Sequence, residues 1–237
     1  MSQNTGGLKE EWSSVVEDAL NRLIPVYRRM NTVMSFGRDS GWRKKGILSA
    51  FGASSKVLDA GCGPGDMTET YISQFQSRAK VVYLFDALPS MLSVAREKLG
   101  RERTAAVRGV FEHMPFRSES FDGIMMGFSF RDAIDMREAL GELNRILRES
   151  GKLLIVDISK PDNRVIRKAI SFYWRYLVPF IAIIVAGKYW RYYKVLYATY
   201  RRLPTNSELK SMVEEYFSKV EIHTEMLGGL IILIASK

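Results

Sequence analysis

The order of apolar and polar positions divides the chain into a helical start, an alternating centre and a mixed end. Apolar residues such as Val15, Ala19 and Leu23 recur at helical spacing, so we expect residues 8–51 to be helical. Short apolar runs then alternate with amphipathic stretches. We expect strands at residues 56–59, 80–85, 105–108, 121–126 and 152–158, and helices at residues 67–75, 90–99 and 133–148. This alternation predicts an α/β fold with a doubly wound, mostly parallel sheet.

The C-terminal part predicts one helix and two strands. Thr205, followed by Glu208 three residues later, is typical of a helix start, so we expect a helix at residues 205–217. Strands are expected at residues 220–222 and 230–235, joined as a hairpin around Gly228 and Gly229. We therefore divide the chain into an N-terminal helical lid (1–50), an α/β core (51–160), a helical insertion (161–204) and a C-terminal part that completes the sheet (205–237).

Composition indicates an ordinary globular protein without a disulfide or a zinc site. The chain has 237 residues, of which 46% are hydrophobic and 26% charged. Its only cysteine is Cys62, and its only histidines are His113 and His223, so neither an internal disulfide nor a zinc cluster is expected. Residues 1–11 are polar and lack the apolar core of a signal peptide. We expect a cytoplasmic location and no metal.

Positive charge is concentrated in the helical insertion. The whole chain has a net charge of 35 − 26 = +9, and residues 160–202 alone contribute ten basic residues and one acid, Asp162. The same stretch contains 11 of the 27 aromatic residues and the longest apolar run, residues 177–186. Ten apolar residues form a helix about 15 Å long, whereas a bilayer core requires roughly 20 residues. Because Pro179 also interrupts the run, we do not expect a transmembrane helix.

Three interpretations of this basic, aromatic stretch remain open. A helix lying in the membrane interface, at the inner face of the membrane, would have this composition. A buried helix with a solvated basic face would have it too. Nucleic-acid binding is the third, because basic residues among aromatics also suit it, but the uninterrupted apolar run favours lipid, and we expect no nucleic acid.

A glycine-rich turn predicts a ligand site at the carboxyl edge of the sheet. Residues 61–65 (Gly-Cys-Gly-Pro-Gly) follow the first expected strand, but the dinucleotide pattern G-x-G-x-x-G is not met because its last position is Asp66. Asp59 and Asp66 border the turn, and two acids disfavour a pyrophosphate there. They suit a ligand with an ammonium and a sulfonium group, such as S-adenosylmethionine (AdoMet). Asp86, at the end of the second strand, can accept both ribose hydroxyls. Alternatively, Asp59 only caps the helix.

Four stretches resemble one family, the ubiquinone/menaquinone-biosynthesis C-methyltransferases (UbiE/MenG), and a fifth resembles the wider class to which they belong. Residues 57–66 resemble motif I of class I AdoMet-dependent methyltransferases in general. Residues 30–42 match the family's entry segment M-N-x-x-x-S-x-G-x-x-x-x-W, and residues 127–132 resemble its F-G-L-R-N loop. Residues 144–161 resemble R-V-L-K-P-G-G…E-x-S-K-P, and residues 193–204 resemble Y-x-x-L-x-x-S-x-R-x-x-P.

The resemblance implies a Rossmann-like sheet of seven strands and methyl transfer from AdoMet to a ring carbon of a prenylated quinol, of the demethylmenaquinone type or a related one. It implies roles for individual positions in this sequence. The expected cofactor-binding residues are Asp59, Gly61, Gly63, Pro64, Asp86, Ala87, Met91, Val110, Phe111 and Gly127. The expected substrate-binding residues are Met30, Asn31, Ser35, Phe128, Tyr193 and Arg201. A homodimer is left open.

The resemblance also points to Arg131 and Asp132 as catalytic residues. A quinol carbon becomes nucleophilic when its hydroxyl loses a proton, so Arg131 would stabilise the phenolate and Asp132 would be the base. Alternatively, the pair only organises its loop. The sequence departs from the family at five positions. Val110 stands where an acid or amide is usual, Pro64 replaces threonine, Asp132 replaces asparagine, Asp157 replaces glutamate, and Arg28 replaces aspartate. A diverged quinone, a different polyprenyl acceptor, or a specialised lineage with the same chemistry would fit these departures. The alternative function is methylation of another lipid, a small-molecule phenol or RNA.

Overall fold

Seven strands form one sheet with the order β3-β2-β1-β4-β5-β7-β6. The computed structural model describes residues 17–52, 56–75 and 81–237. The strands are β1 (Lys56–Ala60), β2 (Val81–Asp86), β3 (Thr104–Arg108), β4 (Phe121–Gly127), β5 (Leu147–Ile158), β6 (Lys219–Glu225) and β7 (Leu230–Ser236). The first five pair in parallel, and β7 runs antiparallel to both β5 and β6. The expected doubly wound α/β fold is confirmed.

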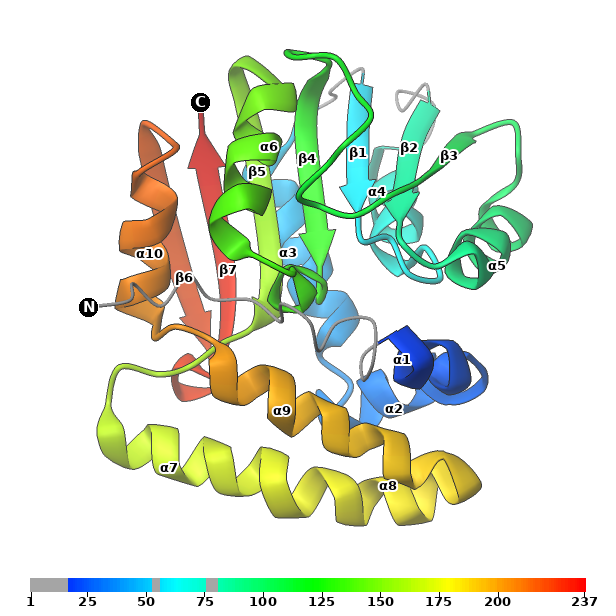
Figure 1. Cartoon of the computed structure of the whole chain (residues 1–237), viewed down its shortest axis with the longest axis vertical. Helices are drawn as coiled ribbons and strands as arrows, with labels where there is room; N and C mark the ends of the chain where they lie inside the picture. The colour runs from blue at the N-terminus through cyan, green and yellow to red at the C-terminus, as the bar shows by residue number, and fades with distance from the viewer. Residues whose placement is uncertain (1–16, 53–55, 76–80) are drawn as a thin grey trace.

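Helices cover both faces of this sheet (Figure 1). Helices α6 (Met136–Ile146) and α10 (Asn206–Glu214) lie on one face, and α3 (Asp39–Ala50) and α4 (Asp66–Phe75) lie on the other. Helix α5 (Pro89–Leu99) packs against β2 and β3. Strand β7 is buried along residues 230–235, which explains its continuous apolar run: a strand covered on both faces needs no polar alternation.

Helix ends differ from the sequence expectations where capping groups and turns intervene. The helix expected at residues 133–148 begins only at Met136, because the Asp135 carboxylate accepts the backbone N–H groups of Arg137 and Glu138. It ends at Ile146, and β5 starts at Leu147, five residues before the expected Lys152. The helix expected at residues 205–217 is α10, which Thr205 and Glu208 cap reciprocally as predicted.

The helical N-terminal part is broken into separate helices. Helix α1 (Glu17–Leu23) passes into a short 3₁₀ turn that contains Pro25, and α2 (Tyr27–Met34) follows. Gly37, with φ of +75°, then turns the chain into α3. The expected helix at residues 8–16 lies outside the described residues. These breaks let α1 and α2 lie beside the carboxyl ends of the parallel strands (Figure 1).

Residues 164–202 form a helical hairpin beyond the carboxyl ends of the parallel strands (Figure 1). One arm consists of α7 (Arg164–Phe172), a π-helical turn (Tyr173–Leu177) and α8 (Val178–Ala186). Gly187, with φ of +55°, reverses the chain, and the 3₁₀ turn η6 (Gly187–Tyr193) leads into the second arm, α9 (Lys194–Arg202). Helix α2 packs against α8, and α9 packs against residues 130–132 after β4. The segment that the sequence marks as a helical insertion consists of two helical arms.

The apolar helix in the first arm is longer than expected. The helical run Arg164–Arg202 contains a window that is long and apolar enough to cross a membrane, by length and composition, and 22% of that window is buried. The expectation that Pro179 would interrupt the helix was wrong. Pro179 lies in the first turn of α8, directly after the wider π-helical turn, so its ring and missing N–H are accommodated and the helix continues.

Candidate active site

The glycine turn joins β1 to α4 and closes tightly against the neighbouring strand. The backbone N–H groups of Gly61 and Cys62 donate to the Phe85 carbonyl oxygen at 2.7 and 3.0 Å. Gly61 has φ of +70°, and a Cβ atom there would lie 2.5 Å from Cβ of Ser129 and 2.8 Å from the ring of Phe111. No other residue fits this position without displacing its neighbours. The turn therefore brings bare backbone to the carboxyl edge of the sheet.

Asp86 fastens this turn from the end of β2. Its Oδ2 atom accepts the N–H of Gly63 at 2.8 Å, and its Oδ1 atom accepts the N–H of Leu88 at 2.9 Å. Burial raises the pKa of Asp86, and the backbone N–H donors partly oppose that rise. The carboxylate thus has a fixed orientation beside the turn, where the sequence predicts the ribose contact.

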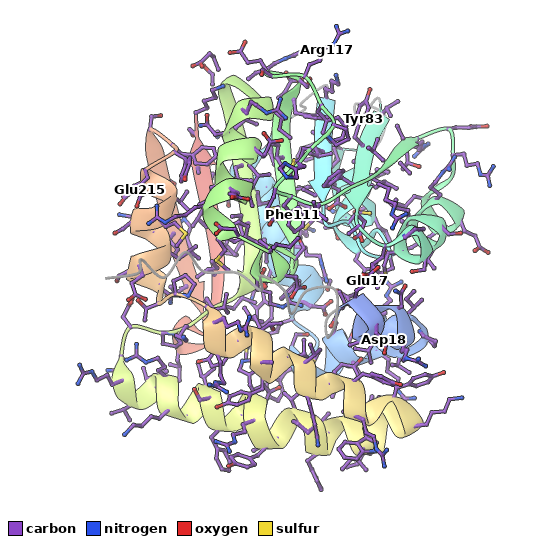
Figure 2. All side chains as sticks on the ribbon, viewed as in Figure 1. Glu17, Asp18, Tyr83, Phe111, Arg117 and Glu215 are labelled. Carbon is purple, nitrogen blue, oxygen red and sulfur yellow. The ribbon has the colours of Figure 1, made fainter. Side chains whose placement is uncertain are left out.

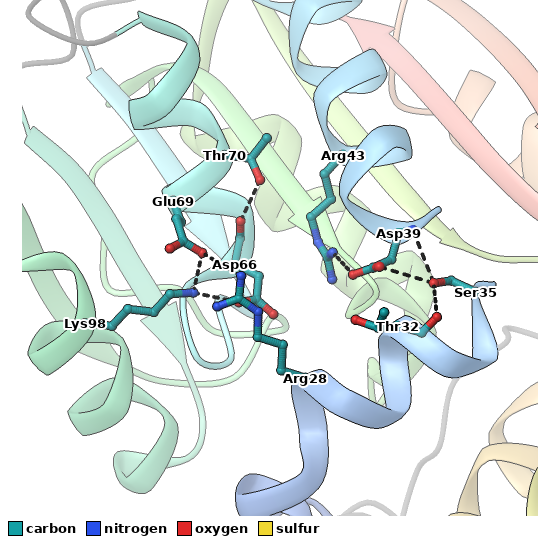
Figure 3. Close-up of polar contacts among 9 residues, drawn as sticks. All are labelled: Arg28, Thr32, Ser35, Asp39, Arg43, Asp66, Glu69, Thr70 and Lys98. Carbon is teal, nitrogen blue, oxygen red and sulfur yellow. Dashed lines mark hydrogen bonds and ion pairs between the residues drawn. The ribbon is translucent and has the colours of Figure 1, made fainter. Parts of the chain in front are cut away.

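The two acids that border the turn do not act together. Asp59 is fully buried, accepts from Oγ1 and N of Thr68 at 2.6 and 3.1 Å, and has a pKa raised to about 7 by burial. Its Oδ1 atom has no hydrogen-bond partner among the described residues. Asp66 instead pairs with Lys98 at 2.7 Å (Figure 3). Asp59 therefore caps α4 through one of its two oxygens, and Asp66 faces an ion pair rather than the cofactor cavity.

A cavity, here called the cofactor cavity, opens between the glycine turn and the ends of β2 and β3. Eight of the predicted site residues line it: Gly61, Asp86, Ala87, Met91, Val110, Phe111, Phe128 and Asp132. Figure 2 labels Phe111, which lies on the loop after β3 near the carboxyl ends of the strands. Four predicted cofactor residues do not line it: Asp59, Gly63, Pro64 and Gly127.

A second and larger cavity of about 280 Å³, here called the acceptor cavity, lies between α2, α3, α7 and the loop after β6. Most of its lining is apolar or aromatic: Met34, Phe36, Trp42, Ile158, Ile170, Tyr173, Trp174, Leu196, Met226, Leu227 and Leu230. A polar chain crosses one wall, where Ser35 Oγ donates to Asp39 Oδ1 at 3.2 Å and Arg43 donates to Asp39 at 2.5 Å (Figure 3). The cavity suits a mainly apolar ligand.

The predicted substrate residues are only partly brought together. Asn31, Ser35, Phe128 and also Arg131 line the acceptor cavity. Met30 is fully buried in the core, and Tyr193 is buried with its hydroxyl unpartnered among the described residues. Arg201 is exposed near the end of α9, where its carbonyl accepts from Lys160. Met30, Tyr193 and Arg201 therefore lie outside the lining of both cavities.

The two cavities meet at Phe128, which lines both. Phe128 has φ of +60°, and its N–H donates to the Val156 carbonyl oxygen at 2.7 Å. The guanidinium of Arg43 lies 4.9 Å from the centre of its ring. The short 3₁₀ helix η4 (Phe130–Asp132) follows, and it directs Arg131 to the acceptor cavity and Asp132 to the cofactor cavity.

Arg131 and Asp132 form a buried, charged pair at this junction. Arg131 Nη1 donates to Asp157 Oδ1 at 2.8 Å, and its Nη2 lies 3.6 Å from Asp132 Oδ2. Burial acts to lower the pKa of Arg131, but the carboxylates of Asp132 and Asp157 outweigh it and the pKa rises. Burial raises the pKa of Asp132 to about 6, although Arg131 opposes the rise. Arg131 is therefore a fixed cation, and the pKa of Asp132 lies above the ordinary range for a carboxyl group.

Two titratable residues of the cofactor cavity, Glu112 and Tyr27, were not among the predicted site residues. Glu112 is buried, its Oε1 atom accepts the N–H groups of Ile134 and Asp135 at 2.7 and 3.0 Å, and its Oε2 atom has no partner among the described residues. The sequence contained a signal for Glu112, because this residue is an acid only two positions after Val110. Tyr27 also lines the cavity, and burial raises the pKa of its phenol. Only the packing of α2 against the sheet end reveals Tyr27.

Comparisons with known proteins decide which family has this arrangement. The model of the ubiE/COQ5 methyltransferase family matches residues 7–237. The chain belongs to this family. It is 33% identical over 226 residues to the ubiquinone/menaquinone biosynthesis C-methyltransferase UbiE of Pseudoalteromonas translucida, covering 93% of this chain and 89% of that protein. It is 30% identical over 205 residues to the demethylmenaquinone methyltransferase of Lactiplantibacillus plantarum, covering 84% of this chain and 86% of that protein.

Solved structures share the fold at lower identity. A SAM-dependent methyltransferase from Thermotoga maritima has a TM-score of 0.65 at 17% identity, covering 93% of this chain and 99% of that one. Another from Methanococcus maripaludis has a TM-score of 0.63 at 19% identity, covering 93% of each chain. Family membership confirms the expected resemblance. The chain is a methyltransferase, and AdoMet is its methyl donor.

Proposed function

We propose that this methyltransferase transfers a methyl group from AdoMet to a ring carbon of a prenylated quinol of the demethylmenaquinone type. The observation that carries the proposal is the meeting of two unlike cavities at Phe128. One has the glycine turn and Asp86, and the other is large and mainly apolar. The names of the relatives, which act in ubiquinone and menaquinone biosynthesis, agree with an acceptor of this class.

The residues of the cofactor cavity suit AdoMet. The turn at Gly61 allows close approach of the methionine part, because only a glycine leaves that space open. Asp86, already oriented by two backbone N–H groups, would hold the ribose hydroxyls. Val110 and Phe111 would flank the adenine. The unpartnered Oε2 atom of buried Glu112 is an acceptor for a donor group of the cofactor, in a position where Val110 offers no side-chain hydrogen bond.

Asp132 and Arg131 would make the quinol carbon nucleophilic. Bound AdoMet supplies an electrophilic methyl group. Asp132, with a pKa of about 6, is mostly ionised at neutral pH and would take the proton of a ring hydroxyl, so that the O–H electron pair stays on the ring system. Arg131 would stabilise the resulting phenolate with a charge that does not titrate in this range. The apolar walls would exclude water from the reacting atoms.

The acceptor cavity would hold the ring near Phe128 and the start of the prenyl chain among Trp42, Tyr173 and Trp174. Such a substrate resides in membranes, so we also propose that the enzyme works as a peripheral protein at the membrane surface. The basic, apolar composition of residues 160–202 supports this location. A homodimer remains a prediction from the sequence.

The test is incubation of the purified protein with reduced demethylmenaquinone and labelled AdoMet, followed by mass spectrometry of the extracted lipid. We expect the quinone to gain the mass of one labelled methyl group. The Asp132→Asn variant, nearly the same in shape, is the matched control and should give far less product. Unchanged quinone in the presence of bound AdoMet would contradict the proposed acceptor.

A further inference from the structure

The first arm of the hairpin exposes a row of large apolar side chains. Phe180 and Ile184 in α8 are 63% and 70% exposed, and the other members follow at helical spacing along the arm: Val165, Phe172, Tyr176, Leu177 and Ile183. Figure 2 shows side chains projecting from this arm on the side away from the sheet. We call these seven residues the outer apolar row. A contiguous apolar surface of this kind marks an interaction site.

The opposite side of the same arm is packed into the protein. Trp174, Val178, Ala182 and Ala186 recur every four residues and are buried. Their side of the helix therefore belongs to the core that includes α2 and α9. A helix that is buried in the protein along one side and exposes apolar side chains along the other is suited to lie in the membrane interface. It is not arranged to cross a bilayer, although its length and composition would allow that.

Exposed basic residues border the outer apolar row. Arg164 and Lys168 lie near its start, Arg175 lies beside its middle, and Lys188 and Arg191 lie at its far end. The far end also combines cations with aromatic rings: Lys188 Nζ lies 5.2 Å from the ring centre of Tyr189, and Arg191 Cζ lies 5.8 Å from that of Trp190. Residues 163–207 contain no aspartate or glutamate. An apolar row bordered by basic and aromatic side chains complements an anionic bilayer surface.

The mouth of the acceptor cavity lies beside this surface. Phe36 and Leu227 line the cavity and are 69% and 79% exposed. The ring of Tyr173, on the same helical arm as the outer apolar row, lies 6.4 Å from the ring of Phe36, and its hydroxyl donates to the Met34 carbonyl oxygen at 2.9 Å. Apolar surface thus continues from the helical arm to the edge of the cavity.

We propose that the outer apolar row seats in one leaflet of an anionic bilayer, with the mouth of the acceptor cavity open to the acyl layer. A prenyl chain would then enter the active site along its own length without crossing water. This inference rests on the proposed function for the identity of the ligand. A second copy of the chain is a poorer occupant, because a symmetric contact would bring two segments together that each have a net charge of 10 − 1 = +9.

The test is flotation of the full chain with vesicles of phosphatidylcholine alone or mixed with phosphatidylglycerol. The wild type should float with the anionic vesicles and far less with the neutral ones. The double variant Phe180→Ser, Ile184→Ser should lower partition to anionic vesicles by about tenfold or more, because it removes two large apolar groups from the bilayer. Leu48→Ser is the matched control: Leu48 is 52% exposed, but it lies in α3 outside both the row and the cavity.

Activity separates this inference from the proposed function. The double variant should keep wild-type turnover of a short-chain, water-soluble quinol and lose turnover of a long-chain quinol in vesicles. Binding of the double variant equal to that of wild type would overturn the inference, as would a wild-type dimer that these two substitutions dissociate. Tight vesicle binding without methylation of either quinol would support the docking surface and overturn the proposed function.

Discussion

Alanine at Gly61 and at Gly63 gives a matched pair of substitutions in one turn. Both glycines have positive φ, +70° and +50°, so each alanine costs about 1–2 kcal/mol of folding free energy for the left-handed conformation alone. They differ in surroundings: a Cβ at Gly61 would lie 2.5 Å from Ser129 Cβ, whereas a Cβ at Gly63 would meet nothing within 4 Å. Overpacking adds about 1–3 kcal/mol for Gly61→Ala only.

The expected loss in the free energy of unfolding is therefore about 2–5 kcal/mol for Gly61→Ala and about 1–2 kcal/mol for Gly63→Ala. Urea denaturation of both variants gives these values directly. Calorimetry with AdoMet should show a larger loss of affinity for Gly61→Ala, because Gly61 lines the cofactor cavity and Gly63 does not. Equal destabilisation, or wild-type affinity for AdoMet in Gly61→Ala, would refute this account of the turn.

Three further predictions concern single side chains. Activity should fall as the pH drops through about 6, because protonation of Asp132 removes the base. The Asp132→Asn variant should lower kcat by about 10²–10⁴-fold and should lose the acidic limb of the pH–rate profile. An acidic limb that persists in this variant would show that another group, such as Asp59, is responsible for it. Asp86→Ala should weaken AdoMet binding by about 10–150-fold in calorimetry, because hydrogen bonds to a charged group are lost; unchanged affinity would place the ribose elsewhere. Thr205→Ala should cost about 1 kcal/mol in urea denaturation by removing the cap of α10, and Ser207→Ala, whose side chain lies outside that capping box, should cost less.

The sequence predicted the fold well because its signals are local. Each strand of the parallel sheet is an apolar run bounded by polar residues, and the glycine turn after β1 has a conformation that glycine alone fits. The start of β5 was missed because Leu147 and the polar residues after it continue the pattern of the preceding helix. The expectation for Pro179 was wrong, because the π-helical turn before it cannot be predicted from composition.

The site was predicted less completely because it depends on contacts between distant segments. Asp66 was expected to face the ligand, but its partner Lys98 comes from α5, 32 residues later. The acceptor cavity is assembled from residues near 35, 130, 170 and 227, which no spacing rule brings together. Arg131 and Asp132 were identified from a motif, but their division between two cavities follows only from the turn of η4.

The most direct test of the central claim is the position of the new methyl group in the product. Incubation of the wild-type enzyme with AdoMet carrying an isotopically labelled methyl, in vesicles that contain the reduced prenylated quinone, should place the label on a ring carbon. Nuclear magnetic resonance of the extracted product distinguishes a methyl bound to carbon from one bound to oxygen. A methyl ether, or label found only in another lipid, would contradict the account.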